Sequence, residues 1–240
     1  MRNSYFQFKK FKIEQEKGSM KVCTDSCLFG AWIADKIKMK TLQPKTILDI
    51  GSGTGLLSLM IAQKSNAKID AVEIDEKSFS QTKENFIDSL WNNRLHAFYA
   101  DIKDRKSKTK YDLIISNPPF FENDLKSKIK SKNLAKHHDA LTLMELLQSI
   151  KDNLSPNGNF AVLLSFHRAS HFKIIAAKEN FYLNEELLIK QTPKHSYFRA
   201  ILFFGTKEVS VINNEIIIKN EEGNYSEPFN FLLKDYYLGI

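Results

Sequence analysis

Residues 46–55 read Thr46-Ile47-Leu48-Asp49-Ile50-Gly51-Ser52-Gly53-Thr54-Gly55, a short apolar run that leads into a glycine-rich turn. A second apolar stretch, residues 56–63, follows the turn and predicts a helix. A strand, a glycine-rich turn and a helix in this order let the backbone approach a ligand closely, and the helix N-terminus favours negative charge. The glycines follow a G-x-G-x-G pattern, whereas dinucleotide enzymes use G-x-G-x-x-G, so the spacing counts against NAD.

Further strand candidates alternate with helical spacers along the chain, which is typical of βα units around a parallel sheet. Strands are predicted at residues 46–50, 68–74, 95–100, 111–116, 160–165, 187–191 and 199–204. Helices are predicted at residues 56–63, 77–89, 141–153 and 169–179, with a turn at Ser155-Pro156-Asn157-Gly158. The loop around Pro193 is too short for a helical crossover, so the last two strands are expected to pair antiparallel. The pattern predicts an α/β fold with a mostly parallel seven-stranded sheet, an antiparallel edge strand and helices on both faces.

The two ends of the chain look like additions to one core. We expect a single domain over residues 1–240, with an N-terminal extension at 1–44 and a C-terminal hairpin and helix at 208–240. Gly223 marks the expected turn before a closing helix at residues 229–237.

The composition is that of a soluble globular protein with a basic surface. Hydrophobic residues make up 42% of the chain and charged residues 26%, and the formal net charge is +7. A basic balance favours a polyanionic partner, although lysine-rich surfaces also serve solubility. No stretch approaches the about 20 apolar residues that cross a bilayer, and no signal peptide is visible, so we expect a cytoplasmic protein. Neither the Cys23 and Cys27 pair nor His137-His138 has the companions of a metal site, and nothing indicates an obligate protein partner.

The run Asn117-Pro118-Pro119-Phe120 follows the predicted strand at 111–116. An aryl amine is a poor nucleophile because its lone pair is delocalised into the ring. If the Asn117 side-chain oxygen and the Pro118 carbonyl accept its two hydrogens, the nitrogen can attack a sulfonium methyl group. Phe120 or Phe121 can stack on a planar substrate. The run therefore predicts methylation of an amino group by positioning and fixed dipoles, whereas a lone Asn-Pro pair would read as a turn.

An acidic residue lies at or near the end of each of the first three predicted strands. Asp49 lies near the end of the first strand, Glu73-Ile74 ends the second and Asp101-Ile102 follows the third. Ligands of open α/β sheets bind at this edge, where Asp49 would face the amino-acid end of a ligand and Glu73 its ribose. Asp101 would accept a hydrogen from an adenine amino group, and Ile102 would cover the ring. Each acid taken singly also reads as a helix cap or a solvated loop residue, but the ordered set predicts a nucleoside-like cofactor.

The segment after the Asn-Pro-Pro-Phe run carries lysines and no acid between residues 126 and 136. We expect this segment to meet phosphates in a salt-dependent manner, although a solvated loop is the alternative. The candidate substrate-binding residues are Phe120, Phe121, Lys126, Lys128, Lys130 and Lys132.

These motifs resemble class I S-adenosylmethionine-dependent methyltransferases, and the closest likeness is to bacterial tRNA1(Val) adenine-37 N6-methyltransferases. The likeness covers most of the chain, including Phe6-x-Phe8-Lys9-x-Phe11, residues 20–25, the residue 49–55 turn, residues 117–121 and the ending around Asp235-Tyr236-Tyr237-Leu238. The resemblance implies S-adenosylmethionine as cofactor and an adenine in the tRNA anticodon loop as substrate. It implies that residues 21–25 pack over the methionine end of the cofactor. Family members often have Tyr where Phe120 stands, which leaves the stacking face and removes a hydroxyl.

The candidate cofactor-binding residues are Lys21, Thr24, Asp25, Asp49, Gly51, Ser52, Gly53, Thr54, Gly55, Glu73, Ile74, Asp101, Ile102 and Asn117. Two alternatives stay open at this point. One is a protein glutamine N5-methyltransferase, or another amino-methyltransferase of RNA or DNA, because the same run suits a side-chain amide. Such glutamine enzymes usually carry a helical N-terminal domain, and only 44 residues precede the first core strand here. The other is a non-catalytic RNA-binding protein on the same fold, which the intact set of Asp49, Glu73, Asp101 and Asn117 disfavours.

Overall fold

The computed structural model describes residues 3–18, 20–105, 110–119 and 141–240. The strands are β1 (Tyr5–Gln7), β2 (Lys12–Glu14), β3 (Thr46–Ile50), β4 (Lys68–Glu73), β5 (Leu95–Tyr99), β6 (Tyr111–Ser116), β7 (Leu154–Ser165), β8 (Tyr182–Lys190), β9 (Tyr197–Gly205) and β10 (Ile212–Ile217). The helices are α1 (Thr24–Lys38), α2 (Leu56–Ala62), α3 (Glu76–Ile87), α5 (Leu143–Asn153), α6 (Phe166–Lys178) and α7 (Glu227–Leu233), and a 3₁₀ turn spans Asn92–Arg94.

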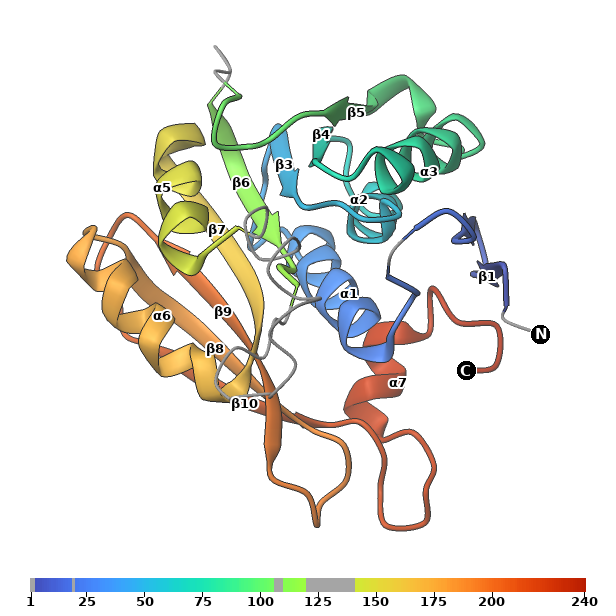
Figure 1. Ribbon diagram of the computed structural model, residues 1–240. Helices are drawn as coiled ribbons and strands as arrows, with labels where there is room; N and C mark the ends of the chain where they lie inside the picture. The colour runs from blue at the N-terminus through green and yellow to red at the C-terminus, as the bar shows by residue number, and fades with distance from the viewer. Residues whose placement is uncertain (1–2, 19, 106–109, 120–140) are drawn as a thin grey trace, which may run out of the picture.

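One large sheet organises the molecule, with strand order β10-β8-β9-β7-β6-β3-β4-β5. Helices lie on both of its faces, with α5 and α6 on one side and α1 on the other (Figure 1). Apolar residues of β3 and β6 alternate between two cores because successive side chains of a strand point to opposite faces. Ile47, Leu113 and Ile115 join α1, α2 and α7 in the first, the α1-side core. Leu48, Ile50 and Ile114 join α5 and α6 in the second, the α5-side core.

This architecture confirms the predicted α/β fold class and corrects two of its details. The sheet has eight strands rather than seven, because β10 pairs in parallel with β8 instead of forming a C-terminal hairpin. Only a single antiparallel bridge, between Lys219 and Tyr225, closes the turn around Gly223. The antiparallel strand of the sheet is β9, which lies between β7 and β8 rather than at the edge.

A bulge replaces the turn that was predicted at residues 155–158. Tyr111 pairs with Leu154, and Leu113 pairs with Asn159. An advance of two residues along β6 therefore corresponds to an advance of five residues along β7. Helix α5 still ends at Asn153, as the sequence predicts, but the chain enters the sheet at once and carries the extra residues within β7.

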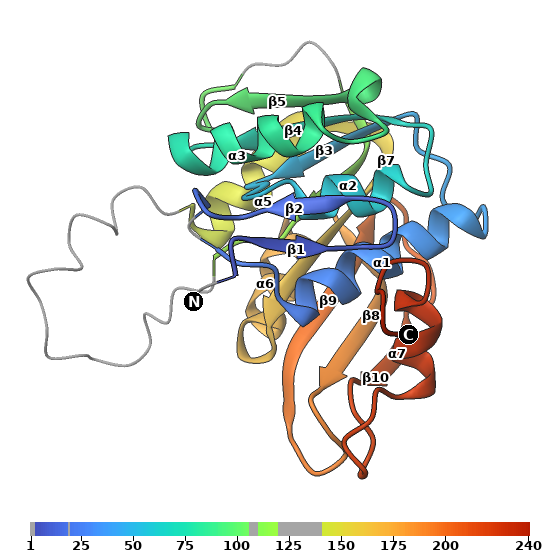
Figure 2. The same ribbon diagram turned by 90° about the vertical axis from the view of Figure 1, so that its right-hand side faces the viewer.

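The N-terminal extension contains two strands and a helix that were not predicted from the sequence. The antiparallel pair β1–β2 lies next to α3, as Figure 2 shows, and the Glu14 N–H donates to Asn85 Oδ1 at 2.9 Å. Helix α1 packs tightly on α2, since a Cβ at Gly30 would lie 2.8 Å from Met60 Sδ. This close packing brings the first turn of α1 to the end of β6, where the candidate site lies.

Candidate active site

The carboxyl ends of four parallel strands form the edge on which the candidate site is built. The strands β6, β3, β4 and β5 are neighbours in that order. Ile50 pairs with both Val72 and Ser116, and Glu73 pairs with Tyr99, so the strands end at nearly the same level. Neighbouring strands lie about 4.8 Å apart, so the four ends span roughly 14 Å. That length suits an extended nucleoside-containing ligand.

Three of the predicted polar side chains share one face of the sheet. Asp49 pairs with Ala71 and with Ile115, and both partners belong to the α1-side core. Glu73 and Asn117 each stand two residues further along their strands, and residues two apart point to the same face. The register therefore places Asp49, Glu73 and Asn117 on the side of the sheet that α1 and α2 cover.

The glycine-rich turn is open at two of its glycines. Gly51 and Gly53 have φ values of 71° and 59°, and a Cβ at either would meet no atom of the described residues within 4 Å. Gly55 differs, because its φ is 80° and a Cβ would lie 2.6 Å from Phe86 Cε1. The first two glycines leave space beside the backbone for a ligand, whereas the third lets the turn pack against α3.

Side chains of β4 and α3 fix this turn. Thr82 Oγ1 donates to the Gly53 carbonyl at 2.6 Å, and Asn85 Nδ2 donates to the Thr54 carbonyl at 2.9 Å. The Gly53 N–H donates to Glu73 Oε2 at 2.8 Å. Ser52 is also buried, with its Oγ 3.5 Å from Thr82 Oγ1. The turn is thus held in place by hydrogen bonds from outside itself.

Asp49 is fully buried, and only one of its two carboxylate oxygens has a hydrogen-bond partner among the described residues. Its Oδ2 accepts a hydrogen bond from Ser58 Oγ at 2.7 Å, while Oδ1 has no partner among the described residues. Burial raises the pKa of Asp49 to about 7, and the negative charge of Glu73 adds to the rise. Burial also raises the pKa of Glu73, although this carboxylate accepts from the Asp75 and Gly53 N–H groups. A cationic ligand group beside Asp49 would favour its ionised form.

The end of β5 carries the remaining predicted cofactor residues. Asp101 Oδ1 accepts from the Lys103 N–H at 2.9 Å, and its Oδ2 lies 3.6 Å from Lys103 Nζ. Ile102 is buried in the α5-side core, whereas Ile74, after β4, is 46% exposed. The structure brings Asp101 to the same edge as Glu73, since the Ala100 N–H donates to the Glu73 carbonyl at 3.1 Å.

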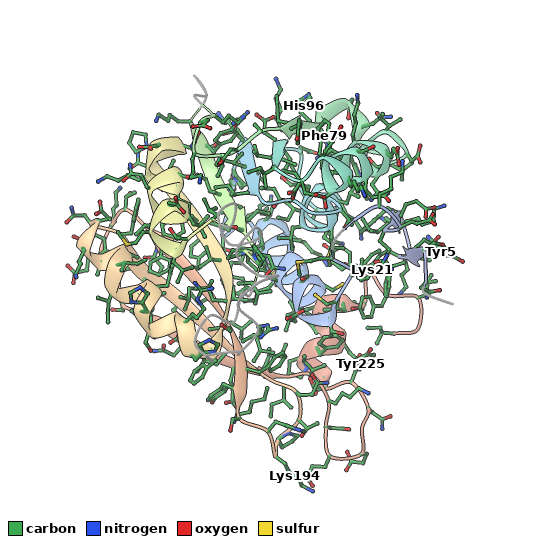
Figure 3. The ribbon with its side chains drawn as sticks, viewed as in Figure 1. Tyr5, Lys21, Phe79, His96, Lys194 and Tyr225 are labelled. Carbon is green, nitrogen blue, oxygen red and sulfur yellow. The ribbon has the colours of Figure 1, made fainter. Side chains whose placement is uncertain are left out.

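The predicted residues 21–25 lead from β2 into α1, where Figure 3 labels Lys21. Lys21 is exposed, and its ammonium group donates to the Gln15 carbonyl. Thr24 begins α1 and is partly buried. Asp25 is buried, and its Oδ2 accepts from Arg199 Nε on β9 at 2.7 Å. An ion pair therefore ties the first turn of α1 to the sheet.

Asn117 is partly buried, and its amide has one satisfied and one unsatisfied end. Its Nδ2 donates to Ser26 Oγ at 2.8 Å, whereas Oδ1 is shielded from solvent and has no partner among the described residues. Pro118 is buried and Pro119 is exposed. A buried acceptor without a donor costs about 1–3 kcal/mol, which a ligand donor would recover. The Asn117 side-chain oxygen is therefore available to accept a hydrogen from a bound molecule.

Within the described ranges, unsatisfied oxygens also occur on Gln63, Asn184 and Asn230, but only those of Asp49 and Asn117 lie at the carboxyl ends of β3 and β6. The predicted substrate residues Phe120, Phe121, Lys126, Lys128, Lys130 and Lys132 lie outside the described residues. The predicted contacts of these six residues stay predictions.

The sequence reasoning missed three residues that support the site. Ser26 directly follows the Thr24-Asp25 pair, and only its contact with Asn117, 91 residues away, gives it importance. Ser58 faces Asp49 from α2, and Arg199 reaches Asp25 from β9. Ser58 stands nine residues after Asp49, in the first turn of the predicted helix at residues 56–63, and this position was the one local signal available.

The turn provides a matched pair of variants. We expect Gly55→Ala to lower thermal stability, because the added methyl group would meet Phe86. We expect Gly53→Ala to lower cofactor affinity more than Gly55→Ala does, because its methyl group would enter the open space beside the turn. The positive φ costs either variant about 1–2 kcal/mol of stability, so the contact with Phe86 should make Gly55→Ala the less stable of the two. Thermal unfolding and calorimetric titration with cofactor would separate the two. Equal effects of both variants on affinity and stability would argue against a ligand at Gly53.

None of the helices within the described ranges combines the length and the hydropathy that a membrane span requires.

The chain matches the methyltransferase small domain family over residues 20–183. A fold comparison finds a predicted O-methyltransferase from Agrobacterium tumefaciens with a TM-score of 0.67 and 14% identity, covering 90% of this chain and 100% of that protein. At that identity the similarity concerns the fold alone.

Full-length relatives are more specific. A tRNA1(Val) (adenine(37)-N6)-methyltransferase from Dyadobacter fermentans is 40% identical, covering 99% of this chain and 98% of the relative. A protein of the same name from Flavobacterium johnsoniae is 38% identical, covering 97% and 99%. The chain therefore belongs to the methyltransferase small domain family and, within it, to the tRNA1(Val) (adenine(37)-N6)-methyltransferases.

Proposed function

We propose that the protein transfers the methyl group of S-adenosylmethionine to N6 of an adenine in tRNA, with adenine 37 of tRNA1(Val) as the acceptor. The relatives that carry this name cover the whole chain at 34–40% identity. The observation that carries the proposal is the buried Oδ1 of Asn117, which lies on the same sheet face as Oδ1 of Asp49. Neither oxygen has a hydrogen-bond partner among the described residues. One oxygen suits a hydrogen of the acceptor amine, and the other suits the cationic end of the donor.

The residues at the strand ends fit S-adenosylmethionine. The open space beside Gly51 and Gly53 lets the ligand approach the protein backbone closely. The buried Asp49 carboxylate can pair with the ammonium group of the ligand. Glu73 would hold the ribose hydroxyls, and Asp101 would accept from the adenine amino group. When bound, the cofactor supplies an electrophilic methyl group. The proposed binding set also includes Lys21, Thr24, Asp25, Ser52, Thr54, Gly55, Ile74, Ile102 and Asn117.

The chain acts on the acceptor by orienting it. The Asn117 side-chain oxygen and the Pro118 carbonyl accept the two hydrogens of N6, which reduces delocalisation of the lone pair into the ring and directs it towards the methyl group. Pro118 and Pro119 restrict the backbone, so that the two acceptors converge on one nitrogen. The proton released after transfer leaves to water, and no general base is required. Catalysis then depends on position and fixed dipoles.

The net charge of +7 fits an RNA partner. An adenine in the single-stranded anticodon loop can be unstacked into a pocket at modest cost. We assign contacts with the loop to Phe120 or Phe121, whose stacking would contribute about 1–3 kcal/mol, and to Lys126, Lys128, Lys130 and Lys132. We further propose that residues 1–240 act as a single domain in the cytoplasm, without an obligate protein partner.

Mass spectrometry of nucleosides tests this function. Unmodified tRNA1(Val) transcript, incubated with the protein and cofactor labelled in its methyl group, should yield labelled N6-methyladenosine. A transcript with guanine at position 37 should yield none. Labelled methylglutamine in a protein substrate, with unlabelled tRNA, would contradict the proposal and favour the glutamine-directed alternative. Failure to bind the cofactor in calorimetry would favour a non-catalytic RNA-binding protein.

A further inference from the structure

Ser26 connects the first turn of α1 to the proposed catalytic amide. It is only 5% exposed, and its Oγ lies 2.8 Å from Asn117 Nδ2. A second contact places the same Oγ 2.9 Å from Cys23 Sγ. Ser26 therefore lies between the thiol of Cys23, the residue before α1, and the Asn117 amide that follows β6.

The orientation of the Asn117 amide decides what the site can bind. An asparagine amide presents an acceptor oxygen at one end and a donor NH₂ group at the other, and a half-turn exchanges them. With the oxygen towards the substrate, the site accepts hydrogens from an amine. With the NH₂ group there, two buried donors would oppose the two hydrogens of that amine. Some neighbouring group must hold one of the two orientations.

The surroundings of Ser26 favour its role as the acceptor for Asn117. When the Ser26 hydroxyl donates to Cys23 Sγ, the lone pairs of its oxygen stay available for Nδ2. Burial and the nearby Asp25 carboxylate raise the pKa of Cys23 to about 11, which keeps the thiol neutral near pH 7. This arrangement satisfies the hydroxyl and leaves Asn117 Oδ1 as the unpartnered atom.

The backbone of Ser26 is itself held in place. Its N–H is one of those that the first turn of a helix leaves without an intrahelical acceptor, and it donates to Asp25 Oδ1 at 3.0 Å. The other oxygen of that carboxylate accepts from Arg199 Nε at 2.7 Å. Arg199 pairs with Ser165 in the sheet, so the position of Ser26 is fixed relative to β7 and β9.

We propose that Ser26 is a positioning residue, which holds the Asn117 amide with its oxygen towards the acceptor nitrogen. The proposal rests on the proposed transfer of a methyl group to an amine. Ser26 touches neither cofactor nor substrate in this role and acts through Asn117. Its loss should therefore lower turnover and leave the binding of both ligands intact.

Steady-state kinetics of Ser26→Ala test this role. We expect kcat to fall about 10- to 100-fold, because the amide would lose its fixed orientation. The KM for tRNA and the Kd for S-adenosylmethionine should stay within about twofold of the wild-type values. Ser149→Ala is the matched control, since Ser149 is also a buried helical serine but lies on α5, where its hydroxyl donates to the Glu145 carbonyl. This control should keep the wild-type kcat.

A measurement on the wild-type protein removes the dependence on activity and on the folding of the variant. Nuclear Overhauser spectra of protein with ¹⁵N-labelled asparagine should show the Asn117 Nδ2 hydrogens near the Ser26 β hydrogens, with Asn117→Ala used for assignment. Absence of this contact, or an unchanged kcat in Ser26→Ala, would overturn the positioning role. Loss of kcat in Asn117→Ala would in that case leave the proposed function standing, so the two failures are distinguishable.

Discussion

Asn117→Ala is expected to lower kcat for tRNA methylation by about 100- to 1000-fold, the range seen when one preorganised hydrogen-bonding group is removed from an active site. The reason is that Oδ1 of Asn117 accepts a hydrogen of the reacting amine in this account, and alanine offers no replacement. The variant should bind S-adenosylmethionine nearly as well as wild type, because Asp49, Glu73 and the glycine-rich turn stay unchanged. Single-turnover kinetics together with calorimetry would measure both quantities.

Asn184→Ala is a matched control for this variant. Asn184 also carries a buried, unpartnered Oδ1, but it lies near Gly205, at the amino end of the parallel strands. The same side-chain deletion there should leave kcat unchanged. If Asn117→Ala lost cofactor binding together with turnover, the main role of Asn117 would be to bind the cofactor rather than to orient the acceptor amine.

Asp49→Asn is expected to stabilise the cofactor-free protein at alkaline pH. The pKa of Asp49 is raised from its ordinary value of 3.8 to about 7 by burial. Between about pH 4 and pH 7 the unfolded chain therefore releases a proton that the folded chain retains, and stability falls as pH rises through this window. The full difference corresponds to about 4 kcal/mol at pH 8, as an upper estimate. Asparagine cannot ionise and escapes this loss.

The same substitution should weaken cofactor binding, because the neutral amide cannot pair with the ammonium group. Denaturant unfolding at pH 4 and pH 8 gives the stabilities, which should agree at the lower pH and diverge at the higher one. Calorimetry of the wild type at pH 6 should show proton release on cofactor binding, since a cationic ligand favours ionised Asp49. Equal stabilities of variant and wild type at pH 8 would contradict the prediction that the ionised, buried Asp49 side chain destabilises the folded protein.

The fold was largely predictable where local pattern and burial agree. Strands β3 and β6 are buried on both faces and read as apolar runs, so their bounds match the prediction. Strand β10 was missed as a member of the sheet because Asn213, Asn214 and Glu215 are exposed at its edge position. Such a strand shows no alternation of apolar and polar residues. It pairs with β8 rather than with β9, the strand that precedes it in the sequence, and local sequence does not encode that choice.

The residues at the strand ends could be predicted from the sequence, whereas the contacts between distant segments of the chain could not. Asp49, Glu73, Asp101 and Asn117 end or follow parallel strands, and the topology alone brings them to one edge. The Ser26 contact with Asn117 joins segments 91 residues apart and depends on the close packing of α1 on α2. Nothing in the local sequence around residue 26 or residue 117 encodes that distance.

A crystal structure of the protein with S-adenosylhomocysteine and an anticodon stem-loop RNA would show whether the Asn117 side-chain oxygen accepts a hydrogen from the adenine amino group. We expect N6 of the target adenine within about 2.7–3.2 Å of Asn117 Oδ1, with Nδ2 still bonded to Ser26 Oγ. An adenine amino group bound away from Asn117, or an amide whose oxygen faces Ser26, would contradict this expectation.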